Sequence, residues 1–389
     1  MKLKEVIDKS TEKEFLQLPV RLYKEEKNWI RPLERDIQAV FDPDQNKHFR
    51  HGEAIRWLLV DEKNNTIGRI AGFFDKKIAT SFEQPTGAIG FFECINNREA
   101  AFMLFDRAKT WLEAKGMEAM DGPVNFGDRD KWWGLLVDGF YEPNYCMPYN
   151  FAYYQSFFES YGFKNYFNQY TYHRTVSDSG LADRIEQTAE RIAKNPDYRV
   201  SHINKKELDK YAYEFRHIYN KAWTRYSGVK EITVTHAKAL LNSLKPILDE
   251  RLIWFTYYKD EPVAFLVMVP EMNQIFKHIN GSLNLWGKIK VFYHLKIKKS
   301  CKKALGLIFG IAEEHQRKGL EGAMIWKFRE KALSTSFPYR ELELNWIGDF
   351  NPTMMRIAEM IGFTIRKTHI TYRYLFDREK EFKRAKRVS

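Results

Sequence analysis

Apolar and polar positions follow the same order in the two halves of the 389-residue chain. Each half contains a stretch that reads as two short strands around a tight turn, and an apolar run of strand length follows it. These stretches are residues 54–74 and 87–95 in the first half, and residues 251–270 and 304–312 in the second. The order therefore predicts a structural unit that occurs twice.

An amphipathic helix is predicted directly after each of these apolar runs. The first covers residues 98–115, with Asn96 as its N-cap and Gly116 as its end. The second begins near Gly319, and its apolar residues recur every four positions, at Leu320, Met324 and Phe328. Each half thus has a helix of about four turns behind its apolar run.

Three further elements complete each half: a strand, a helix that ends in Gly-Phe, and an aromatic strand of alternating polarity. They are predicted at 117–126, 150–163 and 168–174, and again at 340–346, 351–363 and 368–376. In the last helix, Asn351 is the predicted N-cap and Gly362 the stop. The repeat divides the chain into domains 1–175 and 199–389, with a linking helix in 176–198.

Composition indicates a folded protein with a basic surface. The chain is 44% hydrophobic and 15% aromatic, which argues against disorder, and its formal net charge of +12 suggests acidic partners. No signal peptide is predicted in residues 1–15, and no apolar run reaches the length of a membrane span. Three cysteines without a meaningful spacing predict a reduced, cytoplasmic protein with neither a disulfide framework nor a zinc site.

Several classes of site are not expected. His48 and His51 lie close together in the sequence, but no further metal ligand is near them, so no metal site is predicted. The sequence has no Walker loop, no Gly-x-Ser-x-Gly and no zincin motif. Any chemistry must therefore come from another kind of constellation.

The sharpest local signal is the turn at residues 313–323, between an apolar strand and an amphipathic helix. The first N–H groups of a helix have no partner within it and lie at the positive end of its dipole, so they favour phosphate. Gly319 allows a close backbone approach, and Arg317 and Lys318 add positive charge. The turn predicts a pyrophosphate site, although an ordinary loop entering a surface helix can have the same composition.

This order of elements, with the turn Gln316-Arg317-Lys318-Gly319 and Ala323, resembles the GNAT acyl-CoA N-acyltransferases. The whole chain resembles a tandem pair of such domains, similar to a group of mostly uncharacterised bacterial proteins. The resemblance implies an α/β fold with two GNAT-like domains, each a mixed central sheet flanked by helices. It also implies acetyl-CoA or another acyl-CoA as co-substrate, contacted by Ile311, Gln316, Arg317, Lys318, Gly319, Leu320, Gly322, Ala323 and Asn351.

The chain departs from the family pattern in both halves. Glu321 stands where the family usually has Gly or Ala, and Ala358 and Phe158 stand where many members have the Tyr that protonates the leaving thiolate. The first half has residues 96–99, Asn-Asn-Arg-Glu, in place of the phosphate turn. The first domain is therefore expected to serve as a scaffold or substrate wall, and the second to bind the acyl-CoA.

Acyl transfer to an amine requires a base for the amine and stabilisation of the oxyanion. Glu314 and His315 follow the strand that the resemblance puts beside the thioester, so either is a candidate base. Glu343, which shares one face of the fifth strand with Glu341, is a further candidate. The plain alternative is that Glu314 and His315 are solvated turn residues.

Residues 121–150 form the most unusual connection in the sequence, because a long aromatic loop replaces a short one. Long ordered loops are often functional. Aromatic rings beside carboxylates and an arginine suit an amine or amino-acid acceptor, and the candidate residues are Asn125, Asp128, Arg129, Trp132, Trp133 and Tyr149. The alternative is an aromatic plug that packs the two domains together.

A basic segment at residues 283–303 joins the third and fourth strands of the second half. It has seven lysines between positions 288 and 303 and no acidic residue, and Trp286, Ile289, Phe292 and Tyr293 give it an apolar side. The pattern suits an anionic membrane surface, an acidic carrier protein or nucleic acid. A solvated surface helix is the plain alternative.

These observations lead to one main hypothesis and two alternatives. The main hypothesis is a cytoplasmic acyl-CoA-dependent N-acyltransferase that acts on a small-molecule amine or amino-acid-like acceptor. Residues 283–303 are its candidate surface for an acidic carrier protein or for peripheral binding to an anionic membrane. The first alternative is an aminoacyl-tRNA-dependent transferase of the peptidoglycan-bridge type, in which tRNA is the nucleic-acid partner. The second is a non-catalytic ligand-binding protein built on a GNAT scaffold.

Overall fold

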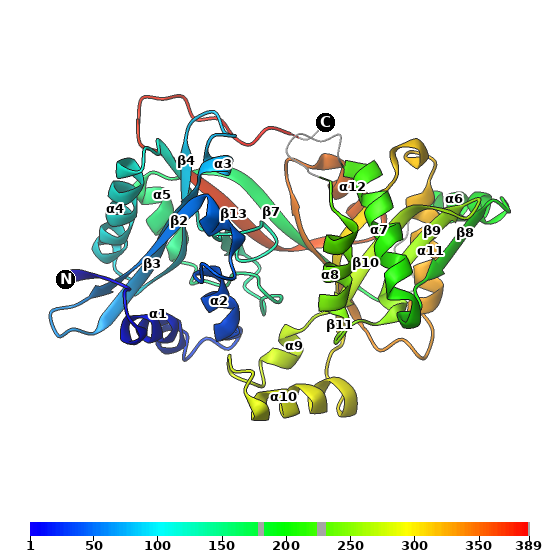
Figure 1. The fold of residues 1–389 in the computed structure, drawn as a ribbon, viewed down its shortest axis with the longest axis horizontal. Coiled ribbons are helices and arrows are strands. Elements are labelled where there is room, and N and C mark those ends of the chain that lie inside the picture. Colours follow the sequence, from blue (N-terminus) through cyan, green and yellow to red (C-terminus); the bar gives the residue numbers. More distant parts are fainter. Residues whose placement is uncertain (178–182, 224–230, 388–389) are drawn as a thin grey trace.

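The computed structural model describes residues 1–177, 183–223 and 231–387. The strands in these ranges are β1 (Lys2–Glu5), β2 (Gly52–Val60), β3 (Thr66–Asp75), β4 (Thr86–Cys94), β5 (Ala119–Gly122), β6 (Leu135–Asp138), β7 (Lys164–Thr175), β8 (Tyr198–His202), β9 (Ile253–Tyr258), β10 (Glu261–Pro270), β11 (Lys303–Ile311), β12 (Glu341–Gly348) and β13 (Thr364–Leu375). They form one mixed sheet, shown in Figure 1.

Helices cover both faces of this sheet. The α-helices are α1 (Lys9–Leu22), α2 (Glu34–Val40), α3 (Lys76–Ala79), α4 (Arg98–Ala114), α5 (Tyr154–Tyr161), α6 (Asp183–Ala193), α7 (Leu208–Trp223), α8 (Val234–Leu244), α9 (Asn273–Phe276), α10 (Leu285–Phe292), α11 (Leu320–Ala332) and α12 (Pro352–Met360). Short 3-10 turns are η1 (Lys47–Arg50), η2 (Lys205–Glu207), η3 (Glu250–Leu252) and η5 (Glu313–His315), and η4 (Tyr293–Ile297) is a π-turn. None of the described helices combines the length and the apolar character that crossing a bilayer requires.

The order of elements agrees with the predicted repeat, with small shifts at element ends. The hairpins are β2–β3 and β9–β10, and β4 and β11 are the apolar runs that follow them. Asn351 caps α12 as predicted, by accepting a hydrogen bond from the Met354 N–H. The predicted N-cap of α4 is wrong by one residue, because the side chain of Asn97, not that of Asn96, accepts the Ala100 N–H.

The two halves exchange their last strands. The sheet order is β1-β2-β3-β4-β5-β13-β7-β12-β11-β10-β9-β8, with β6 paired to β13. β13, from the end of the chain, pairs antiparallel with β5 of the first half, and β7, from the first half, pairs antiparallel with β12 of the second. β7 and β13 also pair with each other at the middle of the molecule (Figure 1). The sheet therefore continues across the boundary between the predicted domains.

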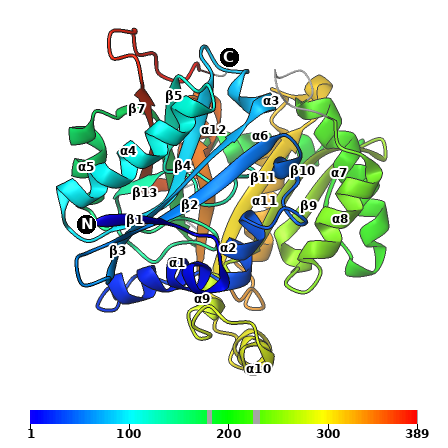
Figure 2. The same ribbon diagram turned by 60° about the vertical axis from the view of Figure 1, so that its left-hand side comes forward.

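Each half buries the two faces of its sheet under different helices (Figure 2). In the first half, α4 and α5 cover the face of Trp57 and Ile70, and α1 and α2 cover the face of Leu58 and Phe73. In the second half, α11 and α12 lie on one face and α7 and α8 on the other. A fully buried residue such as Leu104 on α4 contributes about 1.5–3 kcal/mol.

In both halves the parallel strand pair separates after a few residues. β4 pairs with β5 only along residues 86–88, and β11 pairs with β12 only along residues 303–306. Beyond these residues, β4 and β11 each have a bulge. The bulge of β4 is at Phe91, whose φ is 50°, and that of β11 is at Leu307, which faces no residue of β10. In the first half, the segment after β5 continues to run beside β4, because the Val124 N–H donates to the Ile89 carbonyl at 2.8 Å.

Candidate active site

A cavity of about 100 Å³ lies between α11 and α12 in the second half. Its floor is formed by apolar side chains of three neighbouring strands, including Met268, Phe309 and Leu344. Its walls include Phe328 of α11 and Ala358 of α12. The α11–α12 cavity thus lies over the strands that separate beyond residue 306, and hydrocarbon side chains form most of its surface.

Two features of this cavity concern its chemistry. Ala358, which stands where the family resemblance implies a tyrosine acid, is fully buried in the wall, so its small side chain leaves space and supplies no proton. Arg174 and Arg329 also line the cavity. Burial and the neighbouring Arg329 charge lower the pKa of Arg174, whose guanidinium donates to the Ile361 carbonyl. An apolar space with two guanidinium groups at its border suits a ligand that has an apolar chain and an anionic end.

The turn predicted to hold pyrophosphate has the expected backbone conformation. Gly319 is the N-cap of α11 with φ at 88°, and its helix has no side-chain cap. However, α6 of the predicted linking segment packs on this turn: a Cβ atom at Gly319 would lie 2.1 Å from Thr188 Cγ2, and Arg191 donates to the Lys318 carbonyl at 2.9 Å. An anion at this turn would share the space with α6. The first part of the linking segment, residues 178–182, lies outside the described residues.

The other predicted cofactor contacts have structural partners. Gln316 Nε2 donates to the Ile311 carbonyl at 3.0 Å, and Asn351 acts as a helix cap. Leu320 and Ala323 pack with Ile192 of α6. The predicted residues at the start of α11 are therefore close together, but α6 uses several of them as a packing surface.

The candidate bases Glu314 and His315 do not line the α11–α12 cavity. Glu314 pairs with Lys221 at 2.8 Å on an exposed part of the surface, and the hydrogen bond from Lys221 lowers the pKa of its carboxyl. His315 is buried beside the rings of Tyr198 and Tyr258, and burial lowers the pKa of its imidazole. The ring of His315 is therefore neutral near pH 7, but it faces aromatic side chains rather than the cavity.

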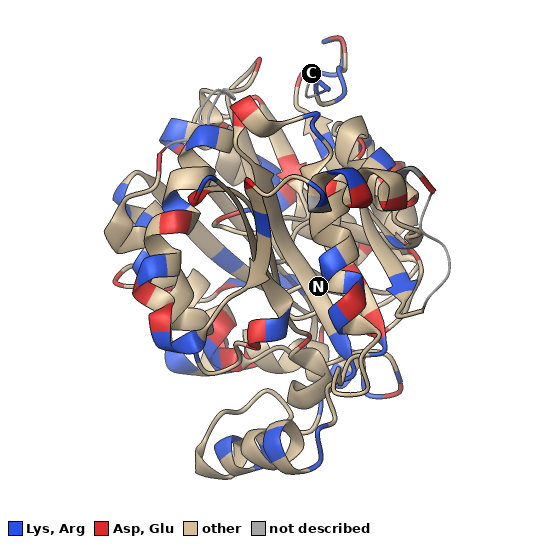
Figure 3. Cartoon of the chain, turned by 90° about the vertical axis from the view of Figure 1, so that its right-hand side faces the viewer, with Lys and Arg blue, Asp and Glu red and all other residues tan. Residues whose placement is uncertain are grey.

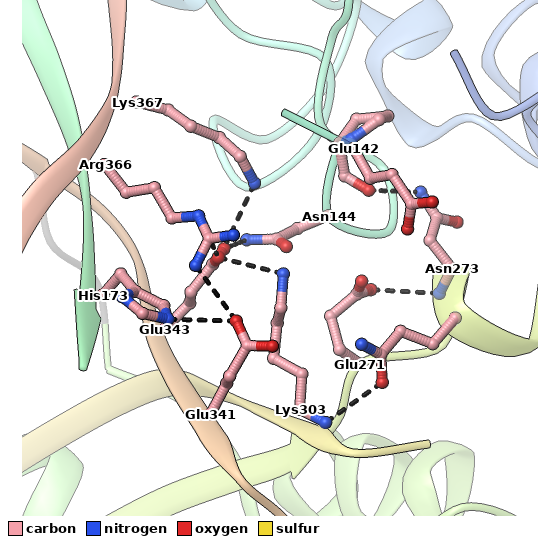
Figure 4. A network of polar contacts seen from close by, with 12 residues as sticks. Glu142, Asn144, His173, Glu271, Asn273, Lys303, Glu341, Glu343, Arg366 and Lys367 are labelled. Carbon is pink, nitrogen blue, oxygen red and sulfur yellow. Dashed lines mark hydrogen bonds and ion pairs between the residues drawn. The ribbon is translucent and has the colours of Figure 1, made fainter. Parts of the chain in front are cut away.

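Glu343 lies at the centre of a buried ionic network between the two halves (Figure 4). Its carboxylate accepts from Lys303 at 2.9 Å, from Lys367 at 3.2 Å and from Asn144 at 2.7 Å. Burial alone would raise the pKa of this carboxyl, but the Lys367 and Lys303 charges outweigh burial and lower it to about 2. A carboxylate held in this way binds a proton weakly, so the network suits a structural role better than the predicted role of a base.

Part of the long loop 121–150 joins this network to the second half. Asn144 contributes to the Glu343 cluster, the Tyr145 N–H donates to Glu271 at 2.8 Å, and Asn273 donates to the Pro143 carbonyl at 2.9 Å. Burial raises the pKa of the Glu271 carboxyl. The loop therefore packs the halves together, as the plug interpretation expects.

A second cavity, of about 90 Å³, lies in the first half between α1, α2, the end of β4 and the loop 123–150. Glu93 of β4 is buried in its wall and accepts hydrogen bonds from the Tyr23 hydroxyl at 2.6 Å and the Tyr154 hydroxyl at 3.0 Å. Arg69 lies 3.6 Å from the same carboxylate. Burial raises the pKa of Glu93 despite these partners, which brings the carboxyl closer to the range of a general base.

The predicted substrate residues divide between this Glu93 pocket and other contacts. Trp132 and Tyr149 line the pocket. The other predicted residues do not line it. Asp128 pairs with Lys47 at 3.3 Å, and Asn125 is buried elsewhere in the loop. Arg129 lies over the ring of Trp133, whose carbonyl accepts a hydrogen bond from Gln169. The sequence analysis did not select Glu93 as a candidate site residue. A single acidic residue inside the apolar run 87–95 was a signal by which it could have been found.

The two histidines near the start of β2 have a third partner. Asp75 lies 2.8 Å from His48 Nδ1 and 2.7 Å from His51 Nδ1, so the argument that no further ligand is near them is wrong. Hydrogen bonds from the His48 ring to the carboxylates of Asp128 and Asp75 raise the pKa of His48. The Asp75 carboxylate accepts a hydrogen bond from His48 Nδ1, but its contact with His51 Nδ1 lacks hydrogen-bond geometry, so that nitrogen is buried without a hydrogen-bond partner in the described part of the chain.

Comparisons with known proteins agree with this architecture, although no family model matches the chain. The chain is 27% identical over 369 residues to a bacterial ceramide synthase of Caulobacter vibrioides, covering 92% of this chain and 94% of that protein. It is 25% identical over 374 residues to protein YghO of Escherichia coli, covering 94% and 93%.

Two solved structures align with nearly the whole chain. A tandem GNAT protein from the clavulanic acid biosynthesis pathway matches with a TM-score of 0.54 and 11% identity, over 96% of this chain and 98% of that one. A GCN5-related glucosamine N-acetyltransferase region of a fungal multi-domain β-N-acetylglucosaminidase matches with a TM-score of 0.53 and 11% identity, over 96% of this chain and 38% of that one. The predicted α/β fold class is confirmed, and the chain has the tandem GNAT fold.

Proposed function

We propose that the protein is an N-acyltransferase that moves a long acyl chain from acyl-CoA to the amine of a lipid-like acceptor. The observation that carries the proposal is the α11–α12 cavity, because its surface is nearly all hydrocarbon and it lies where β11 and β12 separate. Each methylene group moved from water into such a space contributes about 0.8 kcal/mol, so an apolar cavity favours a chain longer than acetyl.

The class of acceptor follows from the relatives. The aligned bacterial ceramide synthase covers nearly the full length of both chains. A ceramide is the N-acyl derivative of a long-chain amino alcohol, so that name favours an amino alcohol over an amino acid as the acceptor. The resulting proposal narrows the amine acceptor expected from the sequence to a lipid amine.

The reaction joins the acceptor nitrogen to the acyl carbonyl carbon and breaks the carbon–sulfur bond of the thioester. The amine gives up one proton to solvent water, and coenzyme A leaves as a thiolate, so atoms and charge balance. Because a free thiol has a pKa near 8.5, the thiolate can leave near neutral pH without the tyrosine acid that Ala358 replaces. We assign the bulge at Leu307 as the part of β11 closest to the thioester carbonyl, since its backbone faces no residue of β10.

The test compares acyl-CoA chain lengths in the full-length protein. Purified protein is incubated with acetyl-CoA or palmitoyl-CoA and a long-chain amino alcohol, and the amide is measured by mass spectrometry. Ala358→Phe fills the cavity wall, so we expect at least a tenfold loss with palmitoyl-CoA and a smaller loss with acetyl-CoA. Ala152→Phe, at an exposed position, is the matched control and should change neither rate.

The Glu93 pocket is a second location for the same chemistry. The raised pKa of Glu93 and its two phenol partners favour it as a base for an amine, which the second half does not offer in its cavity wall. If acylation occurs in the first half, Glu93→Gln should abolish turnover while Ala358→Phe has no effect. If it occurs in the second half, the two results are reversed.

Other outcomes would overturn the proposal. Amide formation from a charged tRNA, with none from any acyl-CoA, would favour the aminoacyl-tRNA-dependent alternative. No turnover and no heat of binding with acetyl-CoA, palmitoyl-CoA or charged tRNA would favour a non-catalytic protein on this scaffold.

A further inference from the structure

The segment at residues 284–299, here called the α10 segment, projects from the body of the protein (Figures 1 and 2). The segment has regular secondary structure. The Asn284 side chain caps α10 by accepting the Gly287 N–H at 2.9 Å, and the helix continues into the π-turn η4. The chain then returns through Cys301, which is buried, to β11.

Large apolar side chains of this segment face solvent. Leu285 and Trp286 are each 72% exposed. Further exposed apolar residues follow along the helix and the π-turn, at Ile289, Phe292, Tyr293 and Ile297. Clustered exposure of this kind marks an interaction surface, whereas single exposed apolar residues need no explanation.

The charges of the segment all have one sign. Its exposed lysines are Lys288, Lys290, Lys296, Lys298 and Lys299, and the segment contains no Asp or Glu. Figure 3 shows the projecting helix with basic positions and no acidic one. No salt bridge to these lysines lies within the described part of the chain. The surface therefore offers uncompensated positive charge beside apolar rings.

The body of the protein holds this segment in place. Ile275 and Phe276 of α9 are buried in the core of the second half, and the His278 and His294 rings stack 3.8 Å apart. The Gly281 carbonyl accepts the Glu34 N–H at 3.0 Å, and a Cβ atom at Gly281 would lie 2.8 Å from Arg31 Cδ. Contacts with the body of the protein thus fix the position of α10 and its apolar side chains, so binding through them requires little further ordering of the segment.

We propose that the α10 segment docks the protein on an anionic phospholipid surface. A helix of this length cannot span a bilayer, but it can lie in the interface with its apolar side chains among the acyl chains and its lysines at the headgroups. Tryptophan and tyrosine are favoured at that depth. A nucleic acid would use the lysines but leave the apolar cluster in water, so the observations favour lipid.

The α10 segment also has a structural connection to the Glu93 pocket. Arg31 and Glu34 both line that pocket and both contact Gly281 at the base of the segment. One wall of the pocket therefore adjoins the base of the α10 segment. Lipid binding itself needs no acyl transfer, so this inference is tested independently of the proposed function.

The experiment measures binding of the full-length protein to sedimented vesicles. Vesicles of phosphatidylcholine with phosphatidylglycerol are compared with vesicles of phosphatidylcholine alone, at rising salt. We expect binding only to the anionic vesicles, weakening as salt shortens the Debye length from about 8 Å toward about 3 Å. Replacing Lys296, Lys298 and Lys299 by Gln should weaken binding by about fivefold for each lysine.

A second pair of variants tests the apolar contribution. The double change Trp286→Ala and Phe292→Ala should weaken binding at least tenfold without lowering the melting temperature, because both side chains are exposed. The control double change Tyr213→Ala and Leu240→Ala alters exposed apolar residues on α7 and α8. The control triple change Lys205→Gln, Lys206→Gln and Lys259→Gln alters exposed lysines elsewhere.

Three results would overturn the proposal. One is vesicle binding that is equal in all variants. Another is no binding of the unmodified protein to anionic vesicles at low salt. The third is lysine-dependent binding to tRNA with vesicle binding unaffected, which would make the segment a nucleic-acid surface.

Discussion

The Glu343 carboxylate and the Lys303 ammonium lie 2.9 Å apart, both buried, on neighbouring parallel strands β12 and β11. Lys367 reaches the same carboxylate from β13. Removing the carboxylate would leave two lysines buried without their counter-charge. Glu343→Leu is therefore expected to lower the free energy of unfolding by about 3–5 kcal/mol, measured by denaturant titration.

Two further measurements separate this structural role from a catalytic one. Replacing Glu343, Lys303 and Lys367 together by Met removes all three charges, so stability should recover most of the loss. If Glu343 were the base, Glu343→Gln would instead abolish turnover with little change in the unfolding curve.

His369 should make the protein sensitive to mild acid. Burial lowers the pKa of its imidazole to about 4, against about 6.5 in an unfolded chain. The unfolded state therefore takes up a proton first as pH falls, so stability present above pH 6.5 is lost between about pH 6.5 and 4. The loss is about 3 kcal/mol.

Thermal unfolding across this pH range provides the check. The melting temperature of His369→Gln should depend less steeply on pH than that of the unmodified protein. His236→Gln, at an exposed position, should keep the slope of the unmodified protein. The stability that Glu343 contributes is lost in a lower pH range, from about 4.5 down to about 2, because the pKa of that carboxyl is lowered. An unchanged slope in His369→Gln would show that this imidazole does not control the transition.

The turn at Gly319 needs a different test from the obvious glycine replacement. A side chain at position 319 would collide with Thr188, so loss of binding in Gly319→Glu would not distinguish a phosphate site from disturbed packing. Arg191 donates to the Lys318 carbonyl and brings a positive charge to the turn. We expect Arg191→Gln to weaken acyl-CoA binding by roughly twofold to fivefold in calorimetry.

Matched changes on α6 complete that test. Lys194→Gln removes an exposed charge from the end of the same segment and should leave the dissociation constant unchanged. Thr188→Gly removes the methyl group that lies against Gly319, so it should preserve or tighten acyl-CoA binding. Equal affinity in all three variants would mean that the pyrophosphate binds elsewhere.

Ala358→Tyr tests the absence of an acid in the α11–α12 cavity. Because Ala358 is fully buried in the cavity wall, a tyrosine should crowd the space as Ala358→Phe does, so the rate with palmitoyl-CoA should fall. The pH–rate profile of the unmodified protein should show one rising limb and no fall near pH 10. A tenfold gain in Ala358→Tyr, about 1.4 kcal/mol, would show that the native site lacks an acid it needs.

Periodicity and turn residues predicted most of the elements because these are local properties. The Asn351 cap and the two hairpins were correct. The exchange of β7 and β13 was not predicted, since the alternating patterns of these two strands fit either half equally well and their partners lie far away in the sequence.

The candidate site was predicted less well for the same reason. Alternation correctly puts Glu341 and Glu343 on one face, but it carries no information that Lys303 and Lys367 meet there. The glycine at 319 has two physical explanations, close approach of a phosphate and close packing of α6, and the sequence of the turn is compatible with both. Glu93 gains its partner hydroxyl groups, from Tyr23 directly after α1 and from Tyr154 of α5, only through folding.

The strand exchange also determines how the chain can mature on the ribosome. β5 ends at Gly122, but the strand that pairs with it, β13, begins at Thr364, so the first half emerges with an open sheet edge and stays incomplete until β13 has been translated. Loss of the last strand would therefore damage the first half of the protein as much as the second. Neither half is a transferable module: expressed as separate fragments, each would lack the strand that the other supplies.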